Sequence, residues 1–347
     1  MSVPRFIVHV GAHKTGTTFL QTVFRTLAPA LRERGVLEPD TWHRLPHQPG
    51  HHQLPIDLMA GAVDSLTRDF AEIKESGFSE ILLSAEGLST LRGPDVALLG
   101  SLLKGAEVSI VFYCRRWSDY LPSHWQTLVR GGIVETMPEN LRPLLLEPAR
   151  YAAVNFGLKL DAYARVFGRD RISIASYSNI IDSGMNLAHH FFEAFLPAHR
   201  SLLDEQPESL AQSKNKSLST PETEMIRGIN ALARKHGERR SSAPSGWFMR
   251  YVEEADRERI GKMIEPGRRV MTVDDKAARL RALHDALFRE WGDRLVEPRL
   301  GDGFFEARVR ELPFISPGRT AAPVVEQALL GLYDQYRRDA GLAPRHA

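Results

Sequence analysis

The stretch Phe6–Thr18, which reads FIVHVGAHKTGTT, constrains the fold more than any other part of the chain. Its first residues form a short apolar run, which is typical of a buried parallel strand. Gly11 and Gly16 enclose the loop that follows, and apolar residues at helical spacing begin at Phe19. Strand, glycine loop and helix is the layout of a phosphate cradle, because loop N–H groups converge and the helix N-terminus adds partial positive charge. The sequence therefore predicts a phosphate site in this loop.

The loop partly matches the pattern of loops that bind nucleoside triphosphates, G-x-x-x-x-G-K-[ST]. Gly11 and Gly16 have the required spacing, but Thr17 stands where the pattern has lysine. The lysine of this chain is Lys14, inside the loop. A lysine at the standard position reaches the β- and γ-phosphates. A lysine two residues before the second glycine suits a shorter phosphate chain, so the loop favours a nucleotide other than ATP or GTP.

A second motif follows the apolar run VSIVFY, residues 108 to 113, which predicts another buried strand. Arg115 comes directly after this run, and Ser123 stands eight residues further on. Arginine binds phosphate in a bidentate manner, and eight residues are a little over two helical turns, which returns the serine to the same side. Arg116 is an alternative one register away, and Pro122 departs from a simple helix.

The two motifs resemble those of the sulfotransferases, whose donor is 3′-phosphoadenosine 5′-phosphosulfate (PAPS). The resemblance implies a P-loop NTPase-like α/β fold, with a mainly parallel sheet flanked by helices and a helical C-terminal part. It implies PAPS as co-substrate, no required metal, and transfer of a sulfuryl group to a hydroxyl or amine. The residues it assigns to the 5′-phosphosulfate are His13, Lys14, Thr15, Gly16, Thr17 and Thr18. It assigns Arg115 and Ser123 to the 3′-phosphate.

Transfer also needs a group that removes a proton from the acceptor. Glu86 follows the apolar run at residues 80 to 84, and ligand sites in open α/β sheets lie beyond the carboxyl ends of strands. We therefore assign Glu86 as the general base and Lys14 as the lysine that stabilises the leaving phosphate. Members of the family take a histidine or a glutamate as base from different positions. The rival bases in this chain are His13, Glu38, His51 and His52.

Histidines are concentrated between residues 40 and 53, at His43, His47, His51 and His52. A histidine-rich tract is a compositional hint of metal binding, but no cysteine or carboxylate completes an obvious ligand set. We interpret the stretch as a solvated loop, with contact to the acceptor as the alternative.

Length and composition limit the remaining possibilities. The chain has 347 residues with 45 basic and 43 acidic side chains, a balance that gives no sign of nucleic-acid binding. Its one cysteine, Cys114, excludes a disulfide framework within one chain, and no apolar run reaches the roughly 18 residues of a membrane span. We expect a cytoplasmic enzyme formed by a single domain, residues 1–347, with a nucleotide-binding core at about 4–200 and a helical part at about 213–347.

Two other functions stay open at this point. A P-loop kinase or NTPase would need Mg²⁺, with Glu86 as a possible acidic ligand, but the G-K-[ST] order is missing. A non-catalytic nucleotide-binding protein would keep the cradle without needing Glu86. The acceptor is predicted only as a carbohydrate or another small molecule, because acceptor loops carry no portable motif, and the oligomeric state is not predicted.

Overall fold

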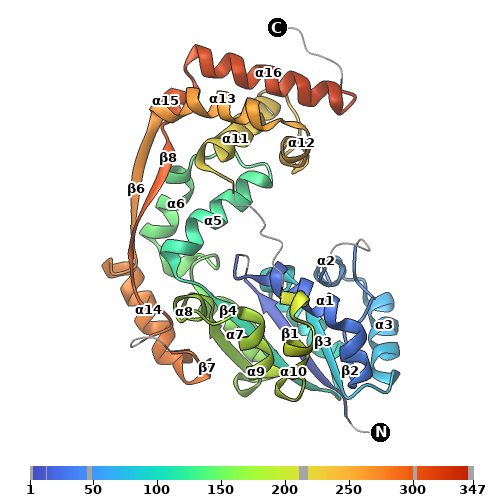
Figure 1. Ribbon diagram of the computed structural model, residues 1–347. Coiled ribbons are helices and arrows are strands. Elements are labelled where there is room, and N and C mark those ends of the chain that lie inside the picture. The colour runs from blue at the N-terminus through green and yellow to red at the C-terminus, as the bar shows by residue number, and fades with distance from the viewer. Residues whose placement is uncertain (1–2, 13, 45–48, 211–217, 300–302, 343–347) are drawn as a thin grey trace. The chain divides into compact units, whose positions relative to one another are not determined.

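The structure of the protein is a computed structural model that describes residues 3–12, 14–44, 49–210, 218–299 and 303–342. The chain forms two compact units, each built from three separate segments (Figure 1). The first unit comprises residues 1–116, 149–214 and 281–307, and the second comprises residues 117–148, 215–280 and 308–347. The assignment of the whole chain to a single domain stays a prediction.

The first unit contains a six-stranded sheet in the order β2-β3-β1-β4-β5-β7, in which all neighbouring strands are parallel. The strands are β1 (Arg5–Gly11), β2 (Val36–Leu37), β3 (Glu80–Ser84), β4 (Glu107–Cys114), β5 (Ile172–Ser176) and β7 (Leu295–Val296). The chain leaves β1 for β2 and β3 on one side and then crosses to β4 on the other. Ligands in open parallel sheets bind where the strand order reverses in this way, which here is the carboxyl end of β1.

Helices cover both faces of this sheet, as β1 illustrates. Phe6 meets Phe70 of α3 on one face at a ring separation of 6.2 Å, while His9 meets Phe24 of α1 and Phe191 of α9 on the other. The helices of this unit are α1 (Thr17–Glu33), α2 (Gln53–Ala60), α3 (Val63–Glu75), α4 (Gly93–Leu102), α7 (Phe156–Phe167), α8 (Tyr177–Asp182), α9 (Leu187–Phe195), α10 (Ser201–Glu205) and most of α14 (Ala278–Trp291). The expected α/β fold with a mainly parallel sheet flanked by helices is confirmed.

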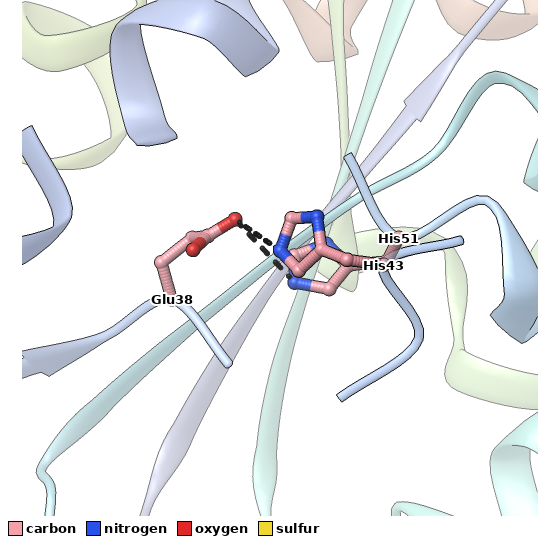
Figure 2. Close-up of side chains that lie close together, drawn as sticks. All are labelled: Glu38, His43 and His51. Carbon is pink, nitrogen blue, oxygen red and sulfur yellow. Dashed lines mark ion pairs between the residues drawn. The ribbon is translucent and has the colours of Figure 1, made fainter. Parts of the chain in front are cut away.

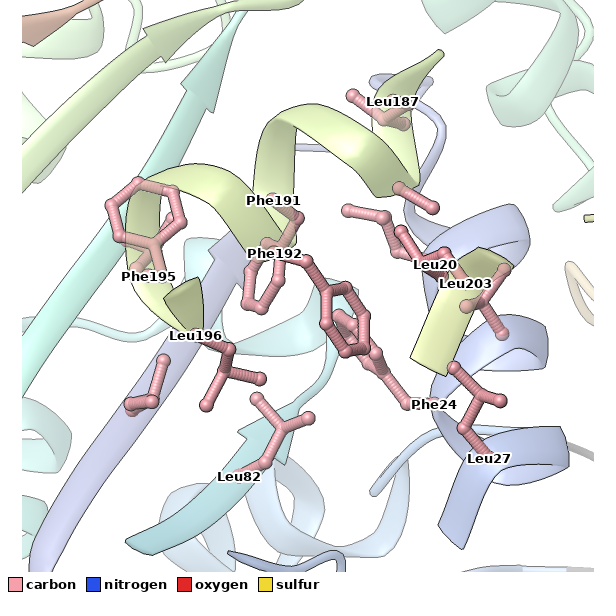
Figure 3. Packing of buried hydrophobic residues seen from close by; sticks show 14 of the residues in the cluster. Leu20, Phe24, Leu27, Leu82, Leu187, Phe191, Phe192, Phe195, Leu196 and Leu203 are labelled. Atoms are coloured by element: carbon pink, nitrogen blue, oxygen red, sulfur yellow. The ribbon is translucent and has the colours of Figure 1, made fainter. Parts of the chain in front are cut away.

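The helix after the glycine loop is fixed by its apolar face. Leu20, Phe24 and Leu27 of α1 are buried against α9, where the rings of Phe24 and Phe191 lie 4.7 Å apart (Figure 3). Each fully buried side chain of this size contributes about 1.5–3 kcal/mol, so this packing holds the end of the loop that leads into α1. Pro29 lies inside the helix, which continues to Glu33.

The second unit is mainly helical but also contains a two-stranded antiparallel ladder. Its helices are α5 (Trp117–Arg130), α6 (Met137–Leu146), α11 (Thr220–Lys235), α12 (Ala243–Tyr251), α13 (Glu254–Ile264), α15 (Pro317–Thr320) and α16 (Pro323–Asp339). The ladder pairs β6 (Arg268–Asp274) with β8 (Val309–Ile315). Ser219 and Glu222 form a capping box at the start of α11.

The first turn of α5 receives its cap from a distant residue. The carboxylate of Asp275, which follows β6, accepts hydrogen bonds from the Ser118 amide at 3.0 Å and the Ser118 hydroxyl at 2.6 Å. A carboxylate at this place satisfies amides that have no partner inside the helix.

Among the described residues, none of the helices combines the length and apolar composition needed to cross a bilayer.

Candidate functional site

The glycine loop has the backbone of a phosphate cradle. It joins the end of β1 at Gly11 to the start of α1 at Thr17, as the sequence predicts. Two of its residues have a left-handed backbone, Lys14 with φ 67° and Gly16 with φ 77°. Alternation of left-handed and ordinary residues turns successive N–H groups to one side, which forms an anion-binding concavity at the N-terminus of α1.

Each glycine of the loop meets a close neighbour. A Cβ atom on Gly11 would lie 2.4 Å from the hydroxyl oxygen of Thr17, closer than any real contact. A Cβ atom on Gly16 would lie 2.3 Å from Leu187 and 2.9 Å from the ring of Tyr177, at a φ that side chains rarely adopt. The loop can therefore keep this shape only with glycine at both positions.

The threonines of the loop have different surroundings. Thr15 is buried, and its hydroxyl donates to the Ala12 carbonyl at 2.7 Å, so this hydroxyl braces the loop. The Thr17 hydroxyl is also buried and lies 3.5 Å from the same carbonyl. Thr18 is exposed. His13 lies outside the described residues, and the assignment of residues 13–18 to a donor stays a prediction.

The register of the sheet places Glu86 beside the cradle. His9 of β1 is level with Ser84 of β3, so Gly11 and Glu86, each two residues further on, lie at the same edge. Glu86 begins a short 3-10 helix and is half-buried. Burial lowers the pKa of His9 to about 3, and the nearby charge of Glu86 opposes this shift. The carboxylate expected to act as the base thus lies next to the strand that carries the loop.

Arg115 lies on the other side of the loop. Gly11 is level with Tyr113 of β4, two residues before Arg115. The Arg115 guanidinium donates to the Lys14 carbonyl at 2.6 Å and lies 5.2 Å from the centre of the Tyr177 ring. The structure therefore brings Lys14, Gly16, Arg115 and Tyr177 together, with Glu86 along the same edge.

The neighbouring arginine has a structural role. Arg116 is 1% exposed, forms an ion pair with Asp182 and donates to the Glu306 carbonyl at 2.6 Å. Its amide donates to the Ser178 hydroxyl at 2.9 Å. These contacts fix Arg116 within the first unit, whereas the Arg115 guanidinium contacts the loop. The register that uses Arg115 is therefore favoured over the alternative.

Ser123, the proposed partner of Arg115, is half-buried on α5. The helix continues through Pro122, so the departure expected there does not interrupt it. Ser123 belongs to the second unit and Arg115 to the first, and their joint action on one phosphate stays a prediction.

The histidine-bearing stretch encloses a buried charged cluster (Figure 2). Glu38 Oε1 lies 3.0 Å from His43 Nε2 and 3.7 Å from His51 Nε2, and Glu38 Oε2 lies 3.3 Å from the Arg25 guanidinium. Burial acts to raise the pKa of Glu38, but the contact with His43 and the charge of the Arg25 guanidinium act against it, and this pKa lies below its usual range. Glu38 is therefore ionised and held by three basic side chains.

The interpretation of this stretch as a solvated loop is wrong for His51, which is 1% exposed. Its Nδ1 accepts the Ser84 amide at 3.0 Å and its Nε2 lies 3.0 Å from the Pro39 carbonyl. Nδ1 therefore carries the lone pair and Nε2 the proton, so neither nitrogen has a lone pair for a metal ion or for an acceptor's proton. His51 does not fit the role of base or ligand in this arrangement. His52 is half-buried, and His47 lies outside the described residues.

Two contacts were not assigned from the sequence. The ring of Tyr177 packs against Gly16 and Arg115, and the sequence signal that points to it is its place directly after a buried strand. Arg25 of α1 pairs with Glu38 and Asp40, which links α1 to the histidine stretch, and no sequence motif predicts this pairing.

No model of a known protein family matches this chain, and no curated protein matches it. Among solved structures, it is similar to a sulfotransferase from Alicyclobacillus acidocaldarius, with 15% identity and a TM-score of 0.35. The alignment covers 74% of this chain and 100% of that one. At this TM-score the likeness is too distant to assign a function.

Proposed function

We propose that the protein is a sulfotransferase that moves a sulfuryl group from PAPS to a hydroxyl or amine. The observation that carries the proposal is the pairing of Arg115 with the glycine loop, at the carboxyl edge of β1 and β4. A loop of inward N–H groups suits the 5′-phosphosulfate, and a separate guanidinium beside it suits a second phosphate. PAPS carries its phosphates at two such separate places on one ribose.

The chemistry needs little covalent help from the chain. The acceptor oxygen or nitrogen forms a bond to sulfur, the bond from sulfur to the 5′-phosphate oxygen breaks, and 3′-phosphoadenosine 5′-phosphate leaves. Lys14 and the loop amides stabilise the charge that develops on the leaving phosphate, and Glu86 takes the acceptor proton. A cytoplasmic location and a carbohydrate or small-metabolite acceptor stay predictions.

Calorimetric titration with 3′-phosphoadenosine 5′-phosphate tests the donor site. We expect metal-independent binding that is tighter than that of ADP, which lacks the 3′-phosphate. Arg115→Ala is expected to weaken binding by about 10- to 100-fold, because a hydrogen bond to a charged group contributes about 1.5–3 kcal/mol. The same substitution should leave ADP binding nearly unchanged.

Arg68→Ala is the matched control, because its side chain is 67% exposed and lies on α3. It is expected to bind both nucleotides as the wild type does. Mg²⁺-dependent binding of ATP, with no preference for the 3′-phosphate, would contradict the proposal and favour a P-loop kinase.

Glu86→Gln tests the base. The amide keeps the size of the side chain but cannot take a proton, so we expect transfer to fall by about 10²- to 10⁴-fold while affinity for 3′-phosphoadenosine 5′-phosphate stays within twofold. Initial rates at saturating PAPS measure the first quantity and calorimetry the second. Unchanged transfer with intact donor binding would remove Glu86 from this role.

A further inference from the structure

We propose that the second unit carries a binding face for an acidic carbohydrate chain, formed by α12 with the adjoining ends of α5, α11 and α16. The inference rests on the proposed function in one respect, since it makes the acidic carbohydrate the acceptor of the sulfuryl group. The face itself is argued from the aromatic hollow and the unpaired cations described below.

The hollow lies between α12 and α16. Its volume is about 310 Å³, and its lining residues are Ala243, Gly246, Trp247, Arg250, Tyr251, Tyr336, Asp339 and Ala340. This volume is at the lower end of the range for small-molecule sites. The rings of Trp247 and Tyr336 are buried and meet edge to face at 5.7 Å, whereas Tyr251 is 52% exposed. The ring of Tyr251 is thus available as a flat apolar wall.

The polar groups of the hollow suit a polyhydroxylated ligand. The indole N–H of Trp247 donates to Asp339 Oδ2 at 2.8 Å, which orients a carboxylate at the rim as an acceptor for hydroxyl groups. Arg250 lies on α12, whereas Asp339 lies on α16, and the Arg250 guanidinium is 5.8 Å from the centre of the Tyr251 ring. A Cβ atom added to Gly246 would meet nothing within 4 Å, so the missing side chain leaves the hollow open above α12.

Exposed cations lie on α12 and near the ends of helices that contact it. The exposed arginines and lysines of α12, of the segment 236–242 before it and of the last turns of α5 and α11 are Arg130, Arg234, Lys235, Arg239, Arg240 and Arg250. None of the six forms an ion pair with a carboxylate in the part of the chain that the structure describes. Many other arginines do, including Arg259 with Asp256 and Arg268 with Glu265. Unpaired cations gathered in this way favour a ligand that brings negative charge.

Two contacts hold the cations together and remove the competing charge. Arg240 donates to the Gly131 carbonyl at 3.0 Å, which brings the segment before α12 to the end of α5 next to Arg130. Glu238, the acidic residue of this segment, accepts the hydroxyl of Tyr333 at 2.6 Å and pairs with Arg337. Its charge is therefore already satisfied, and the segment keeps a positive excess.

A saccharide chain with carboxylate groups fits both features. Its ring faces can stack on Tyr251, its hydroxyls can donate to Asp339, and its carboxylates can pair with the arginines. A neutral saccharide would leave the cations unused. An isolated anion such as sulfate would leave the aromatic hollow unused.

Calorimetric titration with oligogalacturonate, at several salt concentrations, tests the proposal. We expect binding that weakens as salt rises, and no binding of neutral dextran. Arg239→Ala with Arg240→Ala is expected to weaken binding about tenfold and to reduce its salt dependence. Tyr251→Ala is expected to weaken binding about fivefold with unchanged salt dependence, because this substitution removes stacking and no charge.

Arg259→Ala with Arg268→Ala is the matched control, since it removes two exposed cations of the same unit that have local partners. It should bind as the wild type does. An equal loss in this control, binding of dextran, no binding of oligogalacturonate, or tighter binding of polyuridylate RNA would each overturn the proposal. The titration with 3′-phosphoadenosine 5′-phosphate separates the two claims: if that nucleotide fails to bind while oligogalacturonate binds, the proposed function fails and the carbohydrate face stands.

Discussion

Lys14→Ala is expected to lower the rate of sulfuryl transfer by about 10²- to 10³-fold, the effect of removing one positioned donor from a site of developing charge. Lys14 lies in the glycine loop, between the carboxyl end of β1 and the start of α1, and its backbone φ is 67°. Alanine keeps the Cβ atom and therefore the same cost of the left-handed backbone, so the substitution removes the ammonium group alone. Release of 3′-phosphoadenosine 5′-phosphate from PAPS, with the best acceptor from a screen, measures the rate.

Two further measurements separate a catalytic lysine from a merely structural one. Lys14→Arg keeps a positive charge and should recover part of the rate. The thermal midpoint of Lys14→Ala should stay close to that of the wild type, because Lys14 is not one of the residues that form the apolar cluster between α1 and α9. A rate within threefold of the wild type in Lys14→Ala would contradict the role.

Acidification is expected to destabilise the fold steeply below pH 6.5, because burial lowers the pKa of three histidines, His9, His51 and His190. Burial lowers the pKa of His9 to about 3 and that of His51 to about 4. The unfolded chain takes up protons at both sites near pH 6.5, whereas the folded chain does not until much lower pH. Through His9 and His51, the free energy of unfolding should therefore fall by up to about 2.7 kcal/mol per pH unit between pH 6 and 4, about 1.4 for each of the two.

Urea unfolding at a series of pH values measures this slope. His9→Leu removes one of these sites, so its slope should be smaller than that of the wild type by up to about 1.4 kcal/mol per pH unit, whatever its absolute stability. His52→Ala is the control, because the side chain of His52 is half-buried and lies beside His51 in sequence. A wild-type free energy that stays flat from pH 6.5 to 4.5 would show that neither His9 nor His51 is held neutral.

The sequence predicts the central part of the first unit well, and the reason is local. The buried strands β1, β3 and β4 are continuous apolar runs, and a parallel strand covered on both faces has that pattern. Glycine spacing and the helical period after Thr17 then identify the cradle. The edge of the sheet was missed, because β7 has only two residues, Leu295 and Val296, and carries no pattern.

The second unit was harder to predict for a related reason. The strand β6 reads RRVMTVD and is largely exposed, so it shows no apolar alternation that would distinguish it from a loop. In the first unit, the apolar residues from Leu54 to Leu66 suggest one helix, but Gly61, with a φ of 67°, ends α2 before α3 begins. A mid-helix glycine can be tolerated or can cap a helix, and local sequence does not decide between the two.

Sequence reasoning finds those residues of the candidate site that directly follow neighbouring strands. Glu86 and Arg115 each follow a strand next to β1, and the parallel register brings them to the loop. The role of His51 could not be predicted, because it depends on a gap in the sheet. The strand β2 pairs only with residues 80 and 81 of β3, so Ser84 needs another partner on that side. His51 supplies it with its own amide, at 2.8 Å from the Ser84 carbonyl, and with its ring.

The interleaving of the two units has a consequence for how this protein is made. The sheet of the first unit ends at β7, so its last strand is synthesised only after residues 1–294 of this sequence. Until then β5 has an open edge, with amides and carbonyls ready to pair with another nascent chain. Shortened versions that stop near residue 200 would keep this open edge permanently. We expect them to aggregate on expression, although they contain the complete glycine loop and both strands beside it.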